Sequence, residues 1–267
     1  MLHCSTISNS ETWWYFLFGS AILLYKTLFM ITPEKTIILI PTYNEADNIR
    51  ITLQKIHDID PAFHVLVLDD NSPDGTAAVV RDAKKNYPNA SVLVRTSNRG
   101  FAQSYIDGFN LVIAGAEYEA VITMDADFSH EPKELPALLQ LLNNGADIAI
   151  GSRYARKQSF PHISLWRRIM SRFANFYVRT VLGLPITDCT AGFIAMRTDA
   201  LRRLSMERVR TEGYGFLFQL KYRAYKSGFR MAEHPVAWPE RHQGSSKMNL
   251  RRIFESFLLP WKIKFGS

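Results

Sequence analysis

The stretch Val121–His130, VITMDADFSH, places a short apolar run directly before two aspartates. Residues 121–124 have the pattern of a strand buried on both faces, as in a parallel sheet. Asp125 and Asp127 follow where that strand ends, and both can face one spot because residues two apart in an extended chain point the same way. Such carboxylates repel each other, and a shared divalent cation, which prefers oxygen ligands, removes that cost. The alternative interpretation is a solvated turn that caps the helix after Pro132.

Around this stretch, residues 36–154 alternate between apolar runs and helical patterns. The predicted strands are TIILIP, FHVLVLDD, ASVLVRT, EAVITMD and ADIAIGSRY, and each is followed by a helical pattern. This alternation predicts an α/β fold with a mostly parallel sheet covered on both faces. In such sheets, ligands bind outside the carboxyl ends of the strands.

Polar clusters follow four of these strands. They are PTYNE (Pro41–Glu45), DDNSPDGT (Asp69–Thr76), DAD (Asp125–Asp127) and GSRY (Gly151–Tyr154). The chain has no G-x-x-x-x-G-K-[ST] and no G-x-G-x-x-G motif, so no glycine loop holds phosphates. In place of a glycine loop, a metal ion bound by Asp125 and Asp127 is expected to neutralise the charge of a diphosphate.

The composition fits a globular domain and narrows its partners. Hydrophobic residues make up 47% of 267 residues, enough for a sizeable core. Residues 1–150 hold 10 Lys and Arg against 18 Asp and Glu, whereas residues 151–267 hold 22 against 7. This split indicates metal chemistry on one side and an anionic partner on the other: nucleic acid, anionic lipid or a phosphorylated substrate. The two cysteines, Cys4 and Cys189, form no disulfide framework or zinc motif, which favours a reducing setting.

The two ends of the chain suggest contact with a membrane. Trp13–Ile31 is 19 residues long with one charge, Lys26, marginally enough to span a bilayer. The alternative is that Met30 is the true start. Near the other end, residues 164–184 and 249–265 predict basic, aromatic amphipathic helices. Such helices pack against a core or lie on a membrane surface.

Six motifs in a fixed order resemble those of the polyprenyl-phosphate mannosyltransferases, the dolichol-phosphate mannose synthase group of family 2 glycosyltransferases. They are PTYNE, DDNSPDGT, MDADFSH, IGSRY, SRFAN and GSSK, and the resemblance runs from about Thr36 to Phe265. It implies a nucleotide-diphospho-sugar transferase fold (GT-A, Rossmann-like). The implied activity is inverting transfer of mannose from GDP-mannose to a polyprenyl or dolichyl monophosphate. The resemblance implies one glycosyltransferase domain (36–267), with a nucleotide-sugar half (36–154) and an acceptor- and membrane-facing half (155–267). The hydrophobic N-terminal segment (1–35) precedes the resemblance and is expected to be a membrane anchor or to lie before the true start.

The resemblance also assigns residues to the site. The implied pocket for base and ribose comprises Pro41, Tyr43, Glu45 and Asp70. Asp125 and Asp127 become ligands of Mg²⁺ or Mn²⁺, and Ala126 contacts the nucleotide through its backbone. Ser129 stands where some members have a metal-reaching Gln. The residues implied around the diphosphate and acceptor phosphate are Arg153, Arg167, Ser171, Arg241 and Lys247. Asp127, Arg153 and Arg167 are the expected catalytic residues.

The chain departs from the family pattern at three places. DCTAGF (Asp188–Phe193) has Ala191 where Ser or Gly is usual, Gln219 replaces an inward acid, and GSSK replaces GESK. These departures leave open the same reaction with glucose or an amino sugar. A non-catalytic nucleotide- or nucleic-acid-binding protein, suggested only by the pI near 9.4, leaves the acids on one rim unexplained. No nucleic-acid partner is therefore expected.

The expected partners are GDP-mannose, the lipid phosphate, the membrane surface and a small membrane-anchoring subunit. The expected place is the cytoplasmic face of a membrane. Longer family members add C-terminal membrane helices, which this sequence lacks before its last residue, Ser267. Membrane contact is therefore expected to be peripheral or through residues 13–31.

Overall fold

The computed structural model describes residues 30–156, 165–204, 206, 213, 215–237 and 250–266, with only the backbone described at residues 167 and 250–256. Met1–Ile31 and Thr32–Ser267 are two separate compact units. The predicted hydrophobic segment is Trp13–Ile31, and its residues 13–29 lie outside the described part of the chain. In the described part of the chain, no helix combines the length and apolarity that a membrane span requires.

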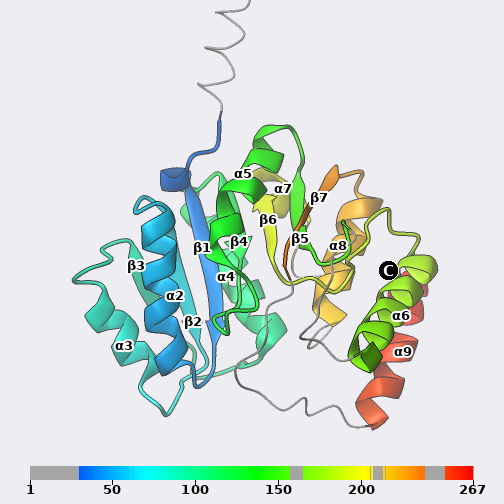
Figure 1. Cartoon of the computed structure of the whole chain (residues 1–267), viewed down its shortest axis with the longest axis horizontal. Coiled ribbons are helices and arrows are strands. Elements are labelled where there is room, and N and C mark those ends of the chain that lie inside the picture. Colours follow the sequence, from blue (N-terminus) through cyan, green and yellow to red (C-terminus); the bar gives the residue numbers. More distant parts are fainter. Residues whose placement is uncertain are drawn as a thin grey trace, which may run out of the picture. The chain divides into compact units, whose positions relative to one another are not determined.

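A seven-stranded sheet lies at the centre of Thr32–Ser267 (Figure 1). Its strands, in spatial order, are β3 (Ala90–Val94), β2 (His64–Asp69), β1 (Thr36–Thr42), β4 (Ala120–Thr123), β6 (Ile194–Arg197), β5 (Ile148–Ser152) and β7 (Met231–Pro235). All neighbours pair in parallel except β6, which is antiparallel to both β4 and β5. The predicted mostly parallel sheet is confirmed, and all five predicted strands of residues 36–154 belong to it.

Helices cover both faces of this sheet. The described helices of this unit are α2 (Ala46–Ile59), α3 (Thr76–Ala83), α4 (Phe101–Gly115), α5 (Leu135–Asn143), α6 (Leu165–Leu182), α7 (Thr198–Arg203), α8 (Gly215–Lys226) and α9 (Leu250–Phe265), with short 3₁₀ turns η1 (Pro33–Lys35) and η2 (Pro132–Glu134). Every described residue of β4 and β5 is buried, as a sheet covered on both faces requires. Helix α7 is an addition that the sequence pattern did not predict.

Alternate side chains of the central strands face different helices. Leu39 of β1 belongs to a core cluster with Tyr105 and Phe109 of α4. On the other face, Val65 of β2 lies beside Leu53 of α2. This alternation follows from the two-residue repeat of a strand. The loops after β1, β2 and β4 lie at one edge because β1 pairs in parallel with both β2 and β4.

Helix α4 approaches the sheet closely at Gly108. A Cβ atom there would lie 2.8 Å from Cδ1 of Leu39 and 2.9 Å from Cδ1 of Leu68. Both distances are shorter than ordinary contacts between carbon atoms. The missing side chain at Gly108 therefore allows α4 to seat its aromatic residues against the core.

The predicted C-terminal helices form at the expected places, as α6 and α9. They lie together: the hydroxyl of Tyr177 donates to the carbonyl of Phe257 (2.7 Å), and the Trp261 indole N–H donates to that hydroxyl (2.9 Å). Their amphipathic character stays a prediction, because the side chains of residue 167 in α6 and of residues 250–256 in α9 lie outside the described set.

Candidate functional site: the carboxyl ends of the strands

The loops after β1 and β2 are joined by hydrogen bonds at one rim of the sheet. Thr42 and Asp69 pair across the two strands, and the Thr42 hydroxyl donates to the Asp69 carboxylate (3.0 Å). The Asn44 N–H donates to the Ser72 hydroxyl (3.0 Å), and the Ala46 N–H to the Asp74 carboxylate (3.0 Å). These bonds fix the PTYNE and DDNSPDGT segments against each other, as their shared place at strand ends predicts.

Within PTYNE, Pro41 is half-buried and Tyr43 is exposed at the rim, while Glu45 lies among other acids. Burial raises the pKa of Glu45, and the charges of Asp127, Asp125 and Asp74 add to that rise, although a hydrogen bond from Asn48 opposes it. The carboxylates that follow β1 and β4 therefore share one negative region. Such a region favours a cation.

The two aspartates of DAD are oriented by neighbouring groups. The backbone N–H of Asp125 donates to Nδ1 of His130 (2.9 Å), and its Oδ1 lies 3.4 Å from the hydroxyl of Tyr105. Burial, and then the charge of Asp125, raise the pKa of Tyr105 well above its usual value, so this hydroxyl stays a donor. The Ser129 N–H donates to Oδ1 of Asp127 (3.0 Å).

The donor set fits a divalent metal. Within the described residues no group of three or more His, Cys, Asp or Glu side chains could hold a metal ion. Two carboxylates are nevertheless enough for Mg²⁺, which keeps waters and takes substrate phosphates as its other ligands. The hydroxyl of Ser129 is buried without a hydrogen-bond partner among the described residues, although such groups normally have one. Asp125 and Asp127, with Ser129 beside them, are thus suited to a hydrated metal.

Asp70, predicted for the base pocket, is fixed by a buried cation. Arg95 is 4% exposed and pairs with Oδ1 of Asp70, while the Gly100 N–H donates to Oδ2 (2.7 Å). Arg95 also pairs with Asp107 at 2.8 Å. A carboxylate has about four acceptor positions, so Asp70 retains acceptor capacity toward a ligand.

Arg153 is held by an acid that sequence reasoning did not assign to the site. Its Nε donates to Oδ2 of Asp188 and its Nη2 to Oδ1, both at 2.8 Å, and Nη2 also donates to the Thr190 hydroxyl (2.9 Å). Burial alone would raise the pKa of Asp188, but the hydrogen bonds and charge of Arg153 outweigh it and lower that pKa. The same pairing raises the pKa of Arg153 despite its burial.

Ser171 is brought to the same edge by α6. Its side-chain oxygen accepts a 2.6 Å hydrogen bond from the hydroxyl of Tyr154, which follows Arg153 directly. The side chain of Arg167, on the same helix, lies outside the described set. Arg241 and Lys247 also lie outside it, so their predicted roles remain predictions.

Several residues around the site were missed from the sequence. They are Arg95, Tyr105, His130, Asp188, Thr190, Lys221 and Glu233. The segment DCTAGF gave a departure from the family pattern at Ala191, but its sequence did not predict a role for Asp188 in the site. Its Asp188 is completely buried, and an ionised buried acid requires a partner, which only the folded chain identifies as Arg153.

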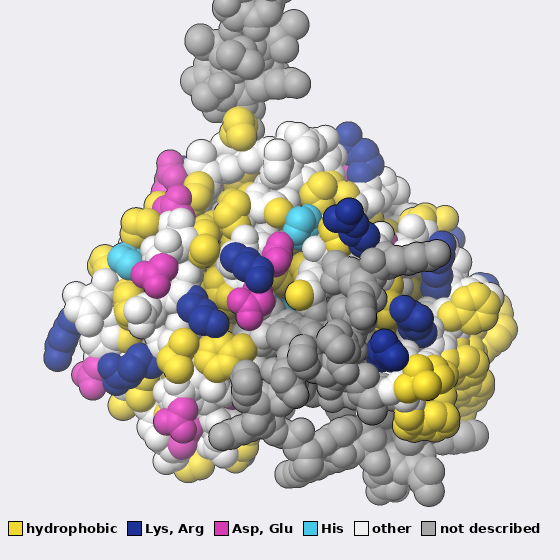
Figure 2. All heavy atoms as spheres, viewed as in Figure 1, with side chains coloured by type: hydrophobic (Ala, Val, Ile, Leu, Met, Phe, Trp, Pro, Cys, Tyr) yellow, Lys and Arg dark blue, Asp and Glu magenta, His cyan; other side chains and the backbone are white. Residues whose placement is uncertain are grey.

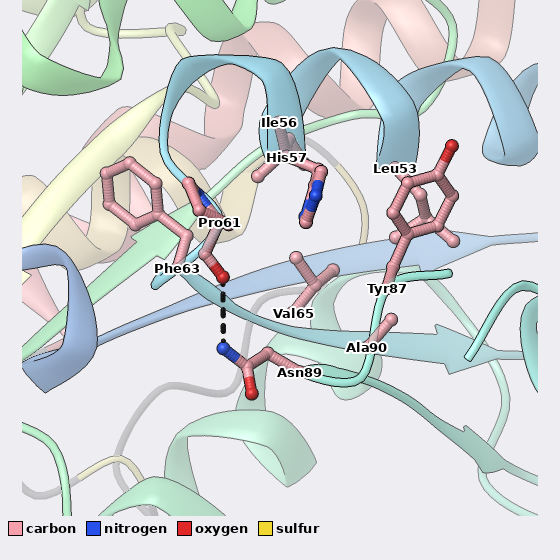
Figure 3. A pocket seen from close by; sticks show the side chains of 9 residues that line it. All are labelled: Leu53, Ile56, His57, Pro61, Phe63, Val65, Tyr87, Asn89 and Ala90. Carbon is pink, nitrogen blue, oxygen red and sulfur yellow. Dashed lines mark hydrogen bonds between the residues drawn. The ribbon is translucent and has the colours of Figure 1, made fainter. Parts of the chain in front are cut away.

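A small pocket lies away from this rim, between the end of α2 and the beginnings of β2 and β3 (Figure 3). His57, Phe63 and Tyr87 help to line it, and the Asn89 side chain donates to the carbonyl of Pro61 (3.1 Å). Its volume of about 10 Å³ suits one water molecule. It is too small for a nucleotide and lies at the wrong end of the strands.

Comparison with known proteins identifies the family. The sequence profile described as "Glycosyl transferase family 2" matches residues 37–205, which include the PTYNE, DDNSPDGT, DAD and GSRY segments. The chain belongs to glycosyl transferase family 2.

The curated relatives of this family 2 glycosyltransferase agree on a subgroup. It is 38% identical to the polyprenol monophosphomannose synthase of Mycolicibacterium smegmatis, over 86% of this chain and 88% of the relative. It is 37% identical to the undecaprenyl-phosphate mannosyltransferase of Micrococcus luteus, over 80% and 88%. The dolichol-phosphate mannosyltransferase of Pyrococcus furiosus is 30% identical, over 83% of this chain and 61% of that protein. These relatives confirm the resemblance to the polyprenyl-phosphate mannosyltransferases.

Solved structures confirm the fold of this glycosyltransferase. Glucosyl-3-phosphoglycerate synthase from Mycobacterium tuberculosis, crystallised with Mn²⁺, UDP and glucosyl-3-phosphoglycerate, superposes with a TM-score of 0.65 at 15% identity, covering 100% of this chain and 87% of that one. The same enzyme with Mg²⁺ and UDP gives a TM-score of 0.62 at 15% identity, covering 98% and 83%. At this identity the likeness is evidence for the shared α/β fold alone.

Proposed function

We propose that this enzyme transfers mannose from GDP-mannose to a polyprenyl monophosphate, inverting the anomeric centre and releasing GDP. The observation that carries the proposal is the pair Asp125 and Asp127 directly after β4, with the buried Ser129 hydroxyl beside them and Glu45 near enough for their charges to add to the rise that burial causes in its pKa. Two carboxylates support this proposal because Mg²⁺ takes its remaining ligands from waters and substrate phosphates. The identity of 37–38% to two polyprenyl-phosphate mannosyltransferases supports the sugar and the acceptor.

The acceptor in this reaction needs no general base. A phosphate monoester already carries about −1.5 to −2 charges at pH 7. One of its oxygens attacks the anomeric carbon while the bond from that carbon to the GDP oxygen breaks, which inverts the centre. The protein's task is to bring one anion close to another.

The two sides of the site divide this task. A Mg²⁺ or Mn²⁺ ion, when bound by Asp125 and Asp127, neutralises charge on the leaving diphosphate. Arg153, fixed by Asp188 and Thr190, presents a cation beyond the end of β5. With Arg167, Ser171, Arg241 and Lys247, which the family resemblance places nearby, it would steer and hold the acceptor phosphate.

The nucleotide base is the less constrained part of the donor. Asp70 can accept a ring N–H, which both guanine and uracil possess. Its carboxylate therefore does not exclude a uridine donor by itself. The experiment must therefore distinguish transfer of mannose from GDP-mannose from the alternative, which is transfer of glucose or an amino sugar from another nucleotide.

The test is transfer of label from several donors. The protein is incubated with Mg²⁺, a short polyprenyl phosphate, and radiolabelled GDP-mannose, UDP-glucose or UDP-N-acetylglucosamine. We expect labelled lipid from GDP-mannose alone and none when polyprenol replaces polyprenyl phosphate. Preference for a uridine donor would establish the alternative sugar, and absence of lipid product with every donor would refute the proposal.

We further propose that the enzyme works at the cytoplasmic face of a membrane, docked through α6 and α9. Large apolar side chains are exposed on both helices, and Figure 2 shows hydrophobic side chains gathered where α6 lies. They include Trp166, Phe173 and Phe176 on α6, and Trp261 and Phe265 on α9. Exposed apolar patches on soluble proteins mark interaction surfaces, and a lipid acceptor makes a bilayer the fitting partner.

Sedimentation with vesicles tests this docking. We expect wild type to sediment with the vesicles. The double variant Trp166→Glu/Phe173→Glu should instead stay in the supernatant. The matched control is Ile51→Glu on α2, because Ile51 is also an exposed apolar residue but lies on a different helix. Equal binding of all three proteins would argue against the α6 surface.

A further inference from the structure

Lys221 of α8 is a completely buried cation that the proposed chemistry does not use. Its ammonium donates to two backbone carbonyls, those of Cys189 (3.0 Å) and Ala191 (2.6 Å). Burying an ammonium is costly unless its hydrogen bonds and its charge are satisfied. Burial lowers the pKa of Lys221 to about 8, although the nearby charge of Asp188 acts to raise it. An apolar side chain at position 221 would avoid this cost. The presence of a lysine therefore points to a role for its hydrogen bonds to the two carbonyls.

Those carbonyls belong to the segment that holds Arg153. Asp188 and Thr190 bind the guanidinium of Arg153, and Lys221 binds the residues directly after each of them. From the other side, the carboxylate of Glu233 accepts the N–H of Asp188 at 3.0 Å. The backbone of this turn is therefore tied to α8 and to β7.

The same segment continues to the metal-binding side of the site. The hydroxyl of Thr123, at the end of β4, donates to the carbonyl of Gly192 (2.6 Å). The next residue, Phe193, stacks on the ring of His130, with centroids 4.9 Å apart, and His130 accepts the N–H of Asp125. Residues 188–193 thus connect Arg153 to Asp125.

We propose that Lys221 is a positioning residue, which fixes the turn at residues 188–191 and thereby sets Arg153 relative to the aspartates of DAD. Its significance for catalysis rests on the proposed function; its effect on Arg153 does not. Because an oxygen of the acceptor phosphate must reach the anomeric carbon of the donor sugar at bonding distance, a shift of Arg153 lowers the rate of transfer more than it lowers donor binding.

The first test observes Arg153 directly. Its Nε–H donates to Asp188, so the ¹⁵N–¹H resonance of that group, assigned by its loss in Arg153→Lys, reports the pairing. We expect Lys221→Met to shift or broaden this resonance. The matched control is Leu220→Ala on the same helix, which opens the buried core but removes no donor to the turn. An unchanged resonance in Lys221→Met, or the same change in Leu220→Ala, would overturn the proposal.

The second test is kinetic. We expect Lys221→Met to lower kcat for mannosyl transfer roughly 10- to 100-fold, with little change in KM for GDP-mannose, while Leu220→Ala keeps kcat near wild type. If wild type transfers no mannose, the proposed function fails, but the resonance of Arg153 still decides the role of Lys221. If wild type is active and Lys221→Met matches it, the positioning role fails alone.

A milder substitution keeps the proposal testable if Lys221→Met does not fold. Lys221→Gln keeps amide N–H donors on a side chain one atom shorter, so it can reach one of the two carbonyls. Should Lys221→Met not fold, we expect Lys221→Gln to give a smaller shift of the Arg153 resonance and a smaller fall in kcat. Values equal to wild type in both measurements would overturn the proposal.

Discussion

The backbone N–H of Asp125 donates a 2.9 Å hydrogen bond to Nδ1 of His130, five residues further along the chain. The acceptor role of Nδ1 places the proton of the neutral ring on Nε2. Because the ring also stacks on Phe193, the loop that carries DAD is closed on itself and tied to the segment leading into β6. The backbone of Asp125, from which the first carboxylate of DAD extends, is thereby held in place before any ligand arrives.

His130→Ala should therefore weaken metal binding without removing a metal ligand. Loss of groups that orient metal ligands typically costs about 10- to 100-fold in affinity. The measurement is titration of Mn²⁺ by electron paramagnetic resonance in the presence of GDP. His57→Ala, which changes a histidine at the other end of the strands, is the control and should bind Mn²⁺ as wild type does. Unchanged affinity in His130→Ala would show that Asp125 needs no such support.

Asp127→Asn should abolish turnover while the fold survives, because it removes half of the carboxylate charge available to the cation. Donor binding should weaken as well, and addition of EDTA to wild type should reproduce the loss of activity. The measurements are initial rates of lipid labelling and thermal unfolding. Asp58→Asn, at an exposed acid near the end of α2, serves as the control. Full activity of Asp127→Asn would exclude this carboxylate as a required metal ligand.

Asp188 should contribute stability that depends on pH. Its folded pKa lies below the ordinary 3.8, so its contribution is present above pH 3.8 and is lost as the pH falls through the lower folded value. Asp188→Asn leaves Arg153 without its charge partner, which should lower the free energy of unfolding at pH 7 by roughly 3–5 kcal/mol. The difference from wild type should shrink toward pH 3, as measured by urea unfolding.

An ion pair whose cation is exposed provides the comparison for that measurement. Asp147 lies 3.7 Å from Arg230, whose side chain is 73% exposed. Asp147→Asn should therefore change stability by less than about 1 kcal/mol. A difference for Asp188→Asn that is equally small, or that is constant from pH 7 to pH 3, would contradict the role assigned to its charge.

A chain started at Met30 should keep full activity toward a detergent-solubilised acceptor. Thr32–Ser267 is a compact unit by itself, and every motif assigned to the site lies within it. The measurement is the rate of lipid labelling beside that of the full chain. An insoluble or inactive product would instead make residues 1–29 a structural part of the enzyme.

The sequence by itself predicted the five strands of residues 36–154 and the edge of the sheet at which the candidate site lies. Apolar runs such as Ile37–Ile40, alternating with helical patterns, predict parallel strands, and the carboxyl ends of such strands lie together. Polar clusters directly after β1, β2, β4 and β5 could therefore be assigned to one rim. The two-residue spacing of Asp125 and Asp127 was sufficient to expect a shared cation. All of these signals are local, because they depend on neighbours along the chain.

Only the tertiary structure decided how the two sides of the site are joined. The antiparallel strand β6 lies between β4 and β5, and its entry carries residues 188–193 from Arg153 to His130. The partners in this connection are far apart in sequence: Arg153 and Asp188 are separated by 35 residues, and Lys221 and Cys189 by 32. A buried ion pair, or an ammonium bound to backbone carbonyls, has no periodicity that a sequence displays. Such contacts form because a buried charge must find a partner wherever the folded chain supplies one.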